Sequence, residues 1–247
     1  MTDSQRPDTV DEYASSAEFH EIHMDAAWAE LADVVGVAFS GLTSRDVVVD
    51  LGAGSGAGTV VLASQTPAEI LAVEPSASMR SMLLVRLAQA GLTDRVTVVA
   101  EGVPDAYDVI DEPITGLVGG HMLGHLGAED RRELFSWLGQ RLAVTGTAVF
   151  TVSGSAPPDP SAVFVEERRV GRHVYRASHS SPDRFTYAST FEVVDGDRVL
   201  RSVDVTGRWE RVTFRDLESE IDGAGLVITE ARPGVVMVRR SPEGRST

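Results

Sequence analysis

The chain has 247 residues, of which 43% are hydrophobic and 24% are charged, an ordinary composition for a globular protein with one sizeable core. Its 37 acidic and 22 basic residues give a formal net charge of −15, and this excess of acid argues against nucleic acid, whose phosphates would be repelled. The absence of cysteine excludes disulfides, a thiolate nucleophile and a cysteine metal site.

The N-terminal residues lack the basic and then apolar pattern of a secretory signal. No apolar run approaches the roughly 20 residues that are needed to span a bilayer. We therefore expect a cytoplasmic protein that makes no membrane contact.

Apolar residues at helical spacing between residues 13 and 39 predict one or two helices before the first strand. Short apolar runs then alternate with helical segments, which predicts an α/β fold: a parallel sheet with helices on both faces. The expected strands are 47–50, 69–74, 95–100, 114–118 and 147–152. The expected helices are 56–65, a segment from Pro75 or Ser76 to Gly91, and 129–142.

Residues 154–161 contain three prolines and interrupt this alternation. Three runs of period-two character follow, at 163–178, 184–194 and 198–212, and Asp195-Gly196-Asp197 between the last two is a hairpin signal. Thr213–Asp216 resembles a capping box opening a helix that ends near Gly223 or Gly225, and strands at 227–231 and 235–239 close the sheet. The chain thus divides into an N-terminal helical cap (1–45), a core (46–153), an antiparallel β lid inserted after strand five (154–212), and a C-terminal helix with closing strands (213–247).

The segment from Val47 to Leu62, VVVDLGAGSGAGTVVL, combines a strand, a glycine-rich turn and the start of a helix. Glycines in such a turn permit positive φ and let a ligand lie against bare backbone. The same glycines fit a loose dinucleotide fingerprint, so by themselves they leave a nicotinamide-dependent dehydrogenase open. Asp50, at the carboxyl end of the strand, favours a ligand that carries an ammonium and a sulfonium over a pyrophosphate.

The string DLGAGSG resembles the first motif of class I S-adenosylmethionine (SAM) dependent methyltransferases. Glu74 ends the second expected strand and Glu101 directly follows RVTVVA, both at spacings that fit this family. The resemblance implies a Rossmann-like sheet with SAM as cofactor, Glu74 holding the ribose hydroxyls and Glu101 the adenine amino group. Met79 would pack on the adenine or belong to the core. The expected cofactor-binding residues are Asp50, Gly52, Ala53, Gly54, Gly56, Glu74, Pro75, Met79, Glu101, Gly102 and His121.

His121 and His125 follow the fourth strand, at the edge that faces the methyl group in this fold. An imidazole there acts as a base or orients an amine. Because the leading helix commonly closes over the cofactor in this fold, Tyr13 and His20 on it are further catalytic candidates. His20 and His23 have no third ligand at an obvious spacing, so we predict no metal site. In the lid, His173, Tyr175, His179 and Tyr187 are candidates to reach inward, whereas Trp209 is expected to pack on a hairpin face.

These features predict a methyltransferase that acts on a small molecule or short peptide, with an amine nitrogen as the favoured acceptor. In outline, the lid after strand five resembles natural-product N-methyltransferases. O-methylation of a carboxylate or hydroxyl is the alternative, and a SAM-binding protein without catalysis is the rival of a different class. A monomer and a homodimer both remain open.

Overall fold

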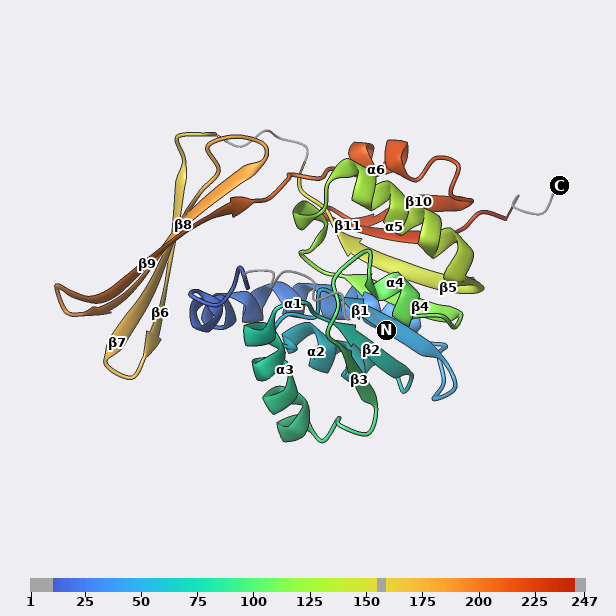
Figure 1. The fold of residues 1–247 in the computed structure, drawn as a ribbon, viewed down its shortest axis with the longest axis horizontal. Coiled ribbons are helices and arrows are strands. Elements are labelled where there is room, and N and C mark those ends of the chain that lie inside the picture. The colour runs from blue at the N-terminus through green and yellow to red at the C-terminus, as the bar shows by residue number, and fades with distance from the viewer. Residues whose placement is uncertain (1–10, 155–158, 243–247) are drawn as a thin grey trace, which may run out of the picture.

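In a computed structural model, which describes residues 11–154 and 159–242, the chain forms two sheets joined by a connector (Figure 1). Residues 1–10, 155–158 and 243–247, which belong to the predicted cap, lid and closing segments, lie outside the described residues.

The larger sheet has seven strands in the order β10-β11-β5-β4-β1-β2-β3. Its strands are β1 (Val47–Leu51), β2 (Glu69–Val73), β3 (Val96–Val99), β4 (Ile114–Gly119), β5 (Leu142–Thr151), β10 (Leu226–Arg232) and β11 (Val235–Arg240). Strands β1 to β5 run parallel, and β11 pairs antiparallel with both β5 and β10. The predicted parallel sheet, closed by two final strands, is confirmed.

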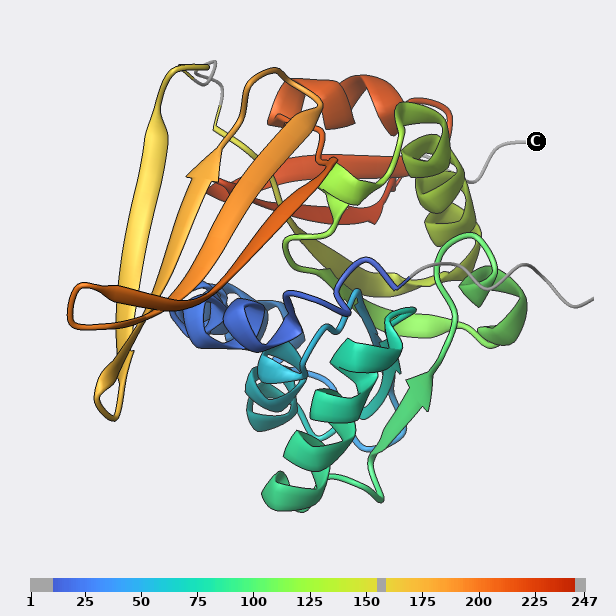
Figure 2. The same ribbon diagram turned by 60° about the vertical axis from the view of Figure 1, so that its left-hand side comes forward.

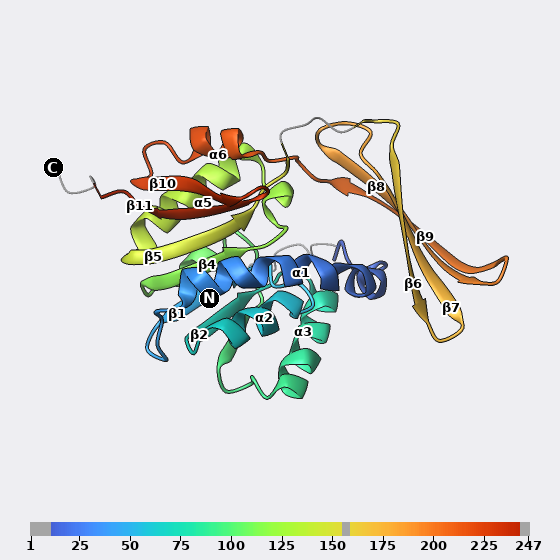
Figure 3. The ribbon, with the colours of Figure 1, turned by 180° about the vertical axis from the view of Figure 1, so that it is seen from behind.

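Helices cover both faces of this sheet (Figures 1 and 3). They are α1 (Ala17–Phe39), α2 (Ala57–Gln65), α3 (Ala77–Ala90), α4 (Ala106–Val109), α5 (Ala128–Arg141) and α6 (Phe214–Glu220), with a 3₁₀ turn η1 (Leu123–His125). Neighbouring side chains of a strand point to opposite faces, so Val48 packs with α1, α2 and α3 while Val49 packs with α4, α5 and α6. The sheet is therefore buried on both sides, as its continuous apolar runs predicted.

Side-chain caps fix where two of these helices begin. The Ser76 hydroxyl accepts a hydrogen bond from the Met79 amide at 3.1 Å at the start of α3. The Thr213 amide donates to the Asp216 carboxylate at 2.8 Å, and the Thr213 hydroxyl accepts from the Asp216 amide at 3.3 Å. The predicted capping box of α6 is confirmed, and such caps stabilise a helix by about 1 kcal/mol.

The N-terminal region is one helix, and Tyr13 lies in the turn that precedes it rather than on it. Helix α1 approaches the sheet closely because two glycines give it room. A Cβ on Gly58 or on Gly120 would lie 2.4 Å from the Trp28 ring. The middle of α1 thus lies directly against the first turn of α2 and the start of the loop after β4.

The smaller sheet is the predicted lid, with strands β6 (Val163–Val170), β7 (His173–Ser180), β8 (Thr186–Asp195) and β9 (Arg198–Arg208) in antiparallel order. The first period-two run, 163–178, forms two strands, β6 and most of β7. Gly171, with φ +59°, makes a tight turn there, and the strand folds back as a hairpin.

The prediction for the last lid strand was too long. Strand β9 ends at Arg208, and residues 209–212 leave the lid as a connector to the core. The N-terminal end of α1 lies beside the lid (Figure 2), where Phe19 is fully buried against Tyr175 and Phe191.

Candidate active site

The predicted cofactor residues gather at one edge of the large sheet, where β1 to β4 end. The glycine turn follows β1, Glu74 follows β2, Glu101 and Gly102 follow β3, and the loop that carries His121 and His125 follows β4. Ligands of doubly wound sheets bind at this edge. The strand order places β1 between β2 and β4, so the groups that follow these strands lie side by side.

Glu74 is held against the glycine turn by its backbone contacts. Its carboxylate accepts from the Gly54 amide at 2.8 Å and from the Ser76 amide at 2.8 Å. Burial raises the pKa of Glu74, and these two amides oppose that effect. A carboxylate oxygen has more than one lone pair, so Glu74 keeps acceptor capacity toward hydroxyl groups beside the turn.

Asp50 is buried in the central strand with a hydrogen-bonding position left unused. The Thr59 hydroxyl donates to Asp50 Oδ2 at 2.6 Å, while Oδ1 has no hydrogen-bond partner. Burial raises the pKa of Asp50 to about 6, and the nearby charge of Glu74 adds to this effect. A buried carboxylate with an unsatisfied oxygen is costly in the absence of a cation or a donor.

The turn itself leaves room for a ligand. Gly52 and Gly54 have φ of +76° and +56°, and a Cβ on Gly54 would meet no atom within 4 Å. Farther along the edge, Gly102 faces Pro75, since a Cβ on Gly102 would lie 3.4 Å from that ring.

The remaining predicted cofactor residues differ in their exposure. Glu101 is partly exposed, whereas Ala53 and Met79 are buried, with 3% and 1% of their surface exposed. The Met79 thioether is thus enclosed by protein.

These residues fit SAM on three observations. Asp50 offers a buried, unpaired oxygen to a cationic ligand. Gly54 leaves open space where a side chain would stand. Glu74 offers a carboxylate anchored beside that space, which is suited to a diol.

The structure also brings together the four residues predicted to be catalytic. The Tyr13 hydroxyl lies 3.0 Å from His125 Nε2. The Tyr13 ring meets the His20 ring edge-on at 5.4 Å, and His121 meets Trp28 edge-on at 6.2 Å. His20 lies close enough to His125 and His121 for their charges to act on it.

Burial sets the charge of this cluster. It lowers the pKa of His20 to about 4 and the pKa of His125 below its usual range, and it raises the pKa of Tyr13. Near pH 7 both imidazoles are therefore neutral and Tyr13 keeps its proton. The Tyr13 hydroxyl and His125 Nε2 therefore meet as two neutral groups, and either of them can be the donor, according to which ring nitrogen of His125 carries the proton.

His121 has a conformation that is rare outside glycine, with φ +54°. Its amide donates to the Thr151 hydroxyl at 2.6 Å, which holds the loop in this conformation. Backbone strain of this kind concentrates at functional sites. The sequence carries no signal for it.

Three residues near the site were not predicted there. The Asp11 carboxylate accepts from the Ser78 amide at 2.9 Å, so the segment before α1 spans from α3 to His125. Trp209 meets the His125 ring edge-on at 4.8 Å, which corrects its expected place on a hairpin face. Glu210, beside Trp209, is buried. Trp209 and Glu210 lie in the connector, where no strand pattern indicates an orientation.

The lid candidates separate into two groups. Tyr187 lies near Tyr13, and the electrostatic interaction between the two helps to raise the pKa of Tyr13. Tyr175 packs on Phe19, and His179 bonds the Ser189 hydroxyl at 2.8 Å. Of the four candidates, Tyr187 is the one for which the structure gives an interaction with the Tyr13 cluster.

A pocket of about 130 Å³ opens beside His121. Its lining includes His121, Gly124, Thr151, Ser153, Trp209 and Glu210. It lies between the loop after β4, the end of β5 and the connector.

Across residues 11–154 and 159–242, no group of three or more histidine, aspartate or glutamate side chains is arranged to hold a metal ion. Within the same residues, no helix is both long and apolar enough to cross a membrane.

The sequence matches no protein-family model and no curated protein. The fold is similar to several solved structures. DesVI of Streptomyces venezuelae has a TM-score of 0.71 at 15% identity, over 96% of this chain and 100% of that chain. A sugar N-methyltransferase from Streptoalloteichus sp has a TM-score of 0.70 at 15% identity, over 98% of both chains. An amino pentose methyltransferase from Micromonospora echinaspora, solved with SAM bound, has a TM-score of 0.68 at 16% identity, over 88% of this chain and 91% of that chain.

The chain therefore has the class I SAM-dependent methyltransferase fold, with an antiparallel lid inserted after the fifth strand. The fold class predicted from the sequence is confirmed.

Proposed function

We propose that this chain is a SAM-dependent methyltransferase that methylates an amine nitrogen of a small molecule or short peptide. SAM supplies a methyl group on a positively charged sulfur, which a nucleophile displaces in line. The protein's tasks are then to hold the cofactor, to orient the acceptor and to receive a proton. The glycine turn, Asp50, Glu74 and Gly102 are the residues that would hold the cofactor.

The observation that carries this proposal is the neutral cluster of Tyr13, His20 and His125 at the acceptor side. An ammonium ion has no lone pair, so an amine must lose a proton before it attacks a methyl group. Because burial lowers the pKa values of His20 and His125, both rings are neutral near pH 7 and neither repels a cationic methyl donor or product. A neutral ring has one nitrogen without a proton, which orients the lone pair of an amine by accepting a hydrogen bond from its N–H. The aromatic faces of Tyr13 and Trp209 also suit an alkylated cationic product.

The charges near the connector favour nitrogen over an anionic acceptor. Arg131 contacts Glu210 and Glu220, and Arg184 contacts Glu210 and Asp216. Both guanidinium groups are thus already neutralised by carboxylates. A carboxylate acceptor would need a cation of its own, which these two arginines do not supply.

The test is a turnover assay with matched acceptors. Solved structures of similar fold include an amino pentose methyltransferase and a glycopeptide N-methyltransferase. The panel therefore holds amino sugars and peptide amines, each beside its hydroxyl and carboxylate analogue. S-adenosylhomocysteine release and product mass are the measurements, and methylation of amines alone is the expected result.

Other outcomes overturn the proposal in different ways. Methylation of hydroxyl or carboxylate analogues alone identifies an O-methyltransferase. SAM binding without turnover across the panel identifies a binding protein. Calorimetry that detects NAD but not SAM identifies a dehydrogenase.

A further inference from the structure

Arg131 is a charged side chain buried in the core, with 1% of its surface exposed. Its partner Glu210 lines the pocket beside His121, which is the acceptor pocket of the proposed function. Arg131 lies in the first turn of α5, where the helix dipole disfavours a cation. Stability of α5 itself therefore does not explain a buried guanidinium at this position.

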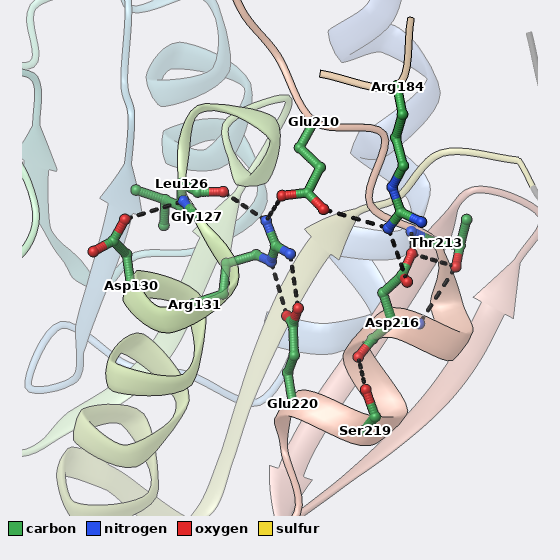
Figure 4. A network of polar contacts seen from close by, with 10 residues as sticks. All are labelled: Leu126, Gly127, Asp130, Arg131, Arg184, Glu210, Thr213, Asp216, Ser219 and Glu220. Carbon is green, nitrogen blue, oxygen red and sulfur yellow. Dashed lines mark hydrogen bonds and ion pairs between the residues drawn. The ribbon is translucent and has the colours of Figure 1, made fainter.

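The guanidinium contacts three segments of the chain at once (Figure 4). Its Nε and Nη2 donate to Glu220 on α6 at 2.8 and 2.7 Å. Its Nη1 donates to the Leu126 carbonyl at 2.6 Å and to Glu210 at 3.1 Å. Each contact comes from a different part of the fold: α6, the loop after β4 and the connector.

The second oxygen of Glu210 extends the network toward the lid. Arg184, just before β8, donates to Glu210 at 3.3 Å and to Asp216 on α6 at 3.0 Å. Figure 4 shows the resulting series of contacts from Glu220 through Arg131, Glu210 and Arg184 to Asp216. The base of the lid is thereby joined to α5 and α6.

The two segments that Arg131 joins are walls of the acceptor pocket. Leu126 directly follows His125, which Tyr13 contacts. Glu210 directly follows Trp209, which packs edge-on against His125. The Glu210 amide also donates to the Gly124 carbonyl at 2.7 Å. One guanidinium thus fixes His125 from one side and Trp209 from the other.

A buried ion pair is a poor means of adding stability, because desolvation offsets much of the attraction. It is a good means of fixing direction, since the fork of an arginine pairs with a carboxylate in one plane. An apolar side chain of similar volume would fill this space without fixing an angle.

We propose that Arg131, acting through Leu126 and Glu210, is a positioning residue. It sets the geometry of Trp209, which lines the acceptor pocket, and of His125, which packs against Trp209. The expected effect of Arg131 on catalysis rests on the proposed function, methyl transfer. The positioning itself is independent of turnover and has its own measurement.

The experiment compares Arg131→Lys and Glu210→Gln with Arg176→Lys as the matched control. Arg176 also pairs with two glutamates, Glu167 at 2.8 Å and Glu192 at 3.2 Å, but within the lid strands. The chain has three tryptophans, so 5-fluorotryptophan labelling gives few ¹⁹F signals, and Trp209→Phe assigns the one from Trp209.

We expect both network variants to shift or broaden the Trp209 signal and to leave those of Trp28 and Trp137 in place. Acceptor kcat/KM should fall by about tenfold or more, since small misplacement of reacting groups is costly. SAM affinity should stay within about threefold, because the network contacts none of the cofactor residues. Arg176→Lys should change none of these quantities.

Glu210→Gln preserves shape and carries the test if Arg131→Lys does not fold. An unchanged Trp209 signal in the folded variants overturns the proposal. Equal shifts of all three signals together with lost SAM binding also overturn it, because they indicate a general structural role. If the wild-type chain methylates no amine, the proposed function fails, while the Trp209 signal still decides the positioning role.

Discussion

Gly54 and Gly91 both have a left-handed backbone conformation, but only Gly54 lies beside the proposed cofactor site. Their φ values are +56° and +68°, and a Cβ on either would meet no atom within 4 Å. Gly54 lies in the turn after β1, whereas Gly91 caps the far end of α3. Alanine at either position costs about 1 to 2 kcal/mol of strain, so we expect similar losses of melting temperature.

Only Gly54→Ala should weaken SAM binding, by about tenfold or more, because its methyl group enters the cofactor space. Isothermal titration of both variants measures this. Equal SAM affinity in the two would show that the turn does not hold the cofactor.

Asp50 makes a prediction about pH with a definite sign. Its pKa is raised to about 6, so the folded state holds this proton more tightly than the unfolded chain does. The stabilisation that Asp50 gains from its raised pKa is fully present below pH 4 and is lost as the pH rises to about 6. This loss lowers the free energy of unfolding by at most about 3 kcal/mol. Asparagine does not ionise, so Asp50→Asn does not lose this stabilisation. In the absence of SAM, the variant should be more stable than the wild type at pH 7.

Urea titrations of wild type and Asp50→Asn from pH 4 to 7 measure the difference, and Asp46→Asn is the control. The Thr43 amide and hydroxyl lower the pKa of Asp46, so its removal should act in the opposite direction. Asp50→Asn should also weaken SAM binding. Destabilisation by Asp50→Asn at pH 7 would contradict the assigned role.

His125→Gln should reduce turnover far more than SAM affinity. If His125 receives the acceptor proton, the loss is on the order of a hundredfold and shrinks at high pH, where the amine loses its proton unaided. A loss that is small and constant with pH would assign His125 to orientation alone. The control is His173→Gln at the tip of the lid, and full activity of His125→Gln would remove this residue from the mechanism.

Between elements, one aromatic side chain of α1 is buried against the lid. Phe19 is fully buried, at 5.1 Å from Phe191 and 5.7 Å from Tyr175 between ring centroids, and Glu18 pairs with Arg201 beside it. This contact holds the end of α1 that carries His20 and follows Tyr13.

Phe19→Ala should cost about 3 to 5 kcal/mol and raise the acceptor KM, because it releases the elements that close the site. Phe164→Ala removes an exposed ring of the same lid and should change neither the stability nor the acceptor KM. Denaturant unfolding, hydrogen exchange of α1 and acceptor kinetics measure the effects. Unchanged exchange in α1 would show that the lid does not hold this helix.

Local patterns account for the elements that were predicted well. The parallel strands of the large sheet are mainly apolar, and Thr213 with Asp216 is a complete capping box. The turn at Gly171 was not predicted because period-two alternation continues on both sides of it. The connector at 209–212 was not predicted because its path away from the lid depends on contacts with the core.

For the whole molecule, the sequence by itself determined the α/β class and the antiparallel insertion, and it predicted which residues gather at the carboxyl edge of the large sheet. Asp50 lies at the end of β1, and Glu74 and Glu101 come just after β2 and β3. Parallel strands bring their carboxyl ends to one edge without further information. Glu74 and the glycine turn were therefore predictable from local patterns alone.

Only the tertiary structure decided the acceptor side. Tyr13 and His125 are 112 residues apart in sequence, and Arg131 and Glu220 are 89 apart. Their meeting depends on how α1, the lid and α6 pack, since short-range periodicity records which face a residue occupies but not which distant side chain it meets. The loop strain at His121 and the burial of Arg131 arise from the same packing.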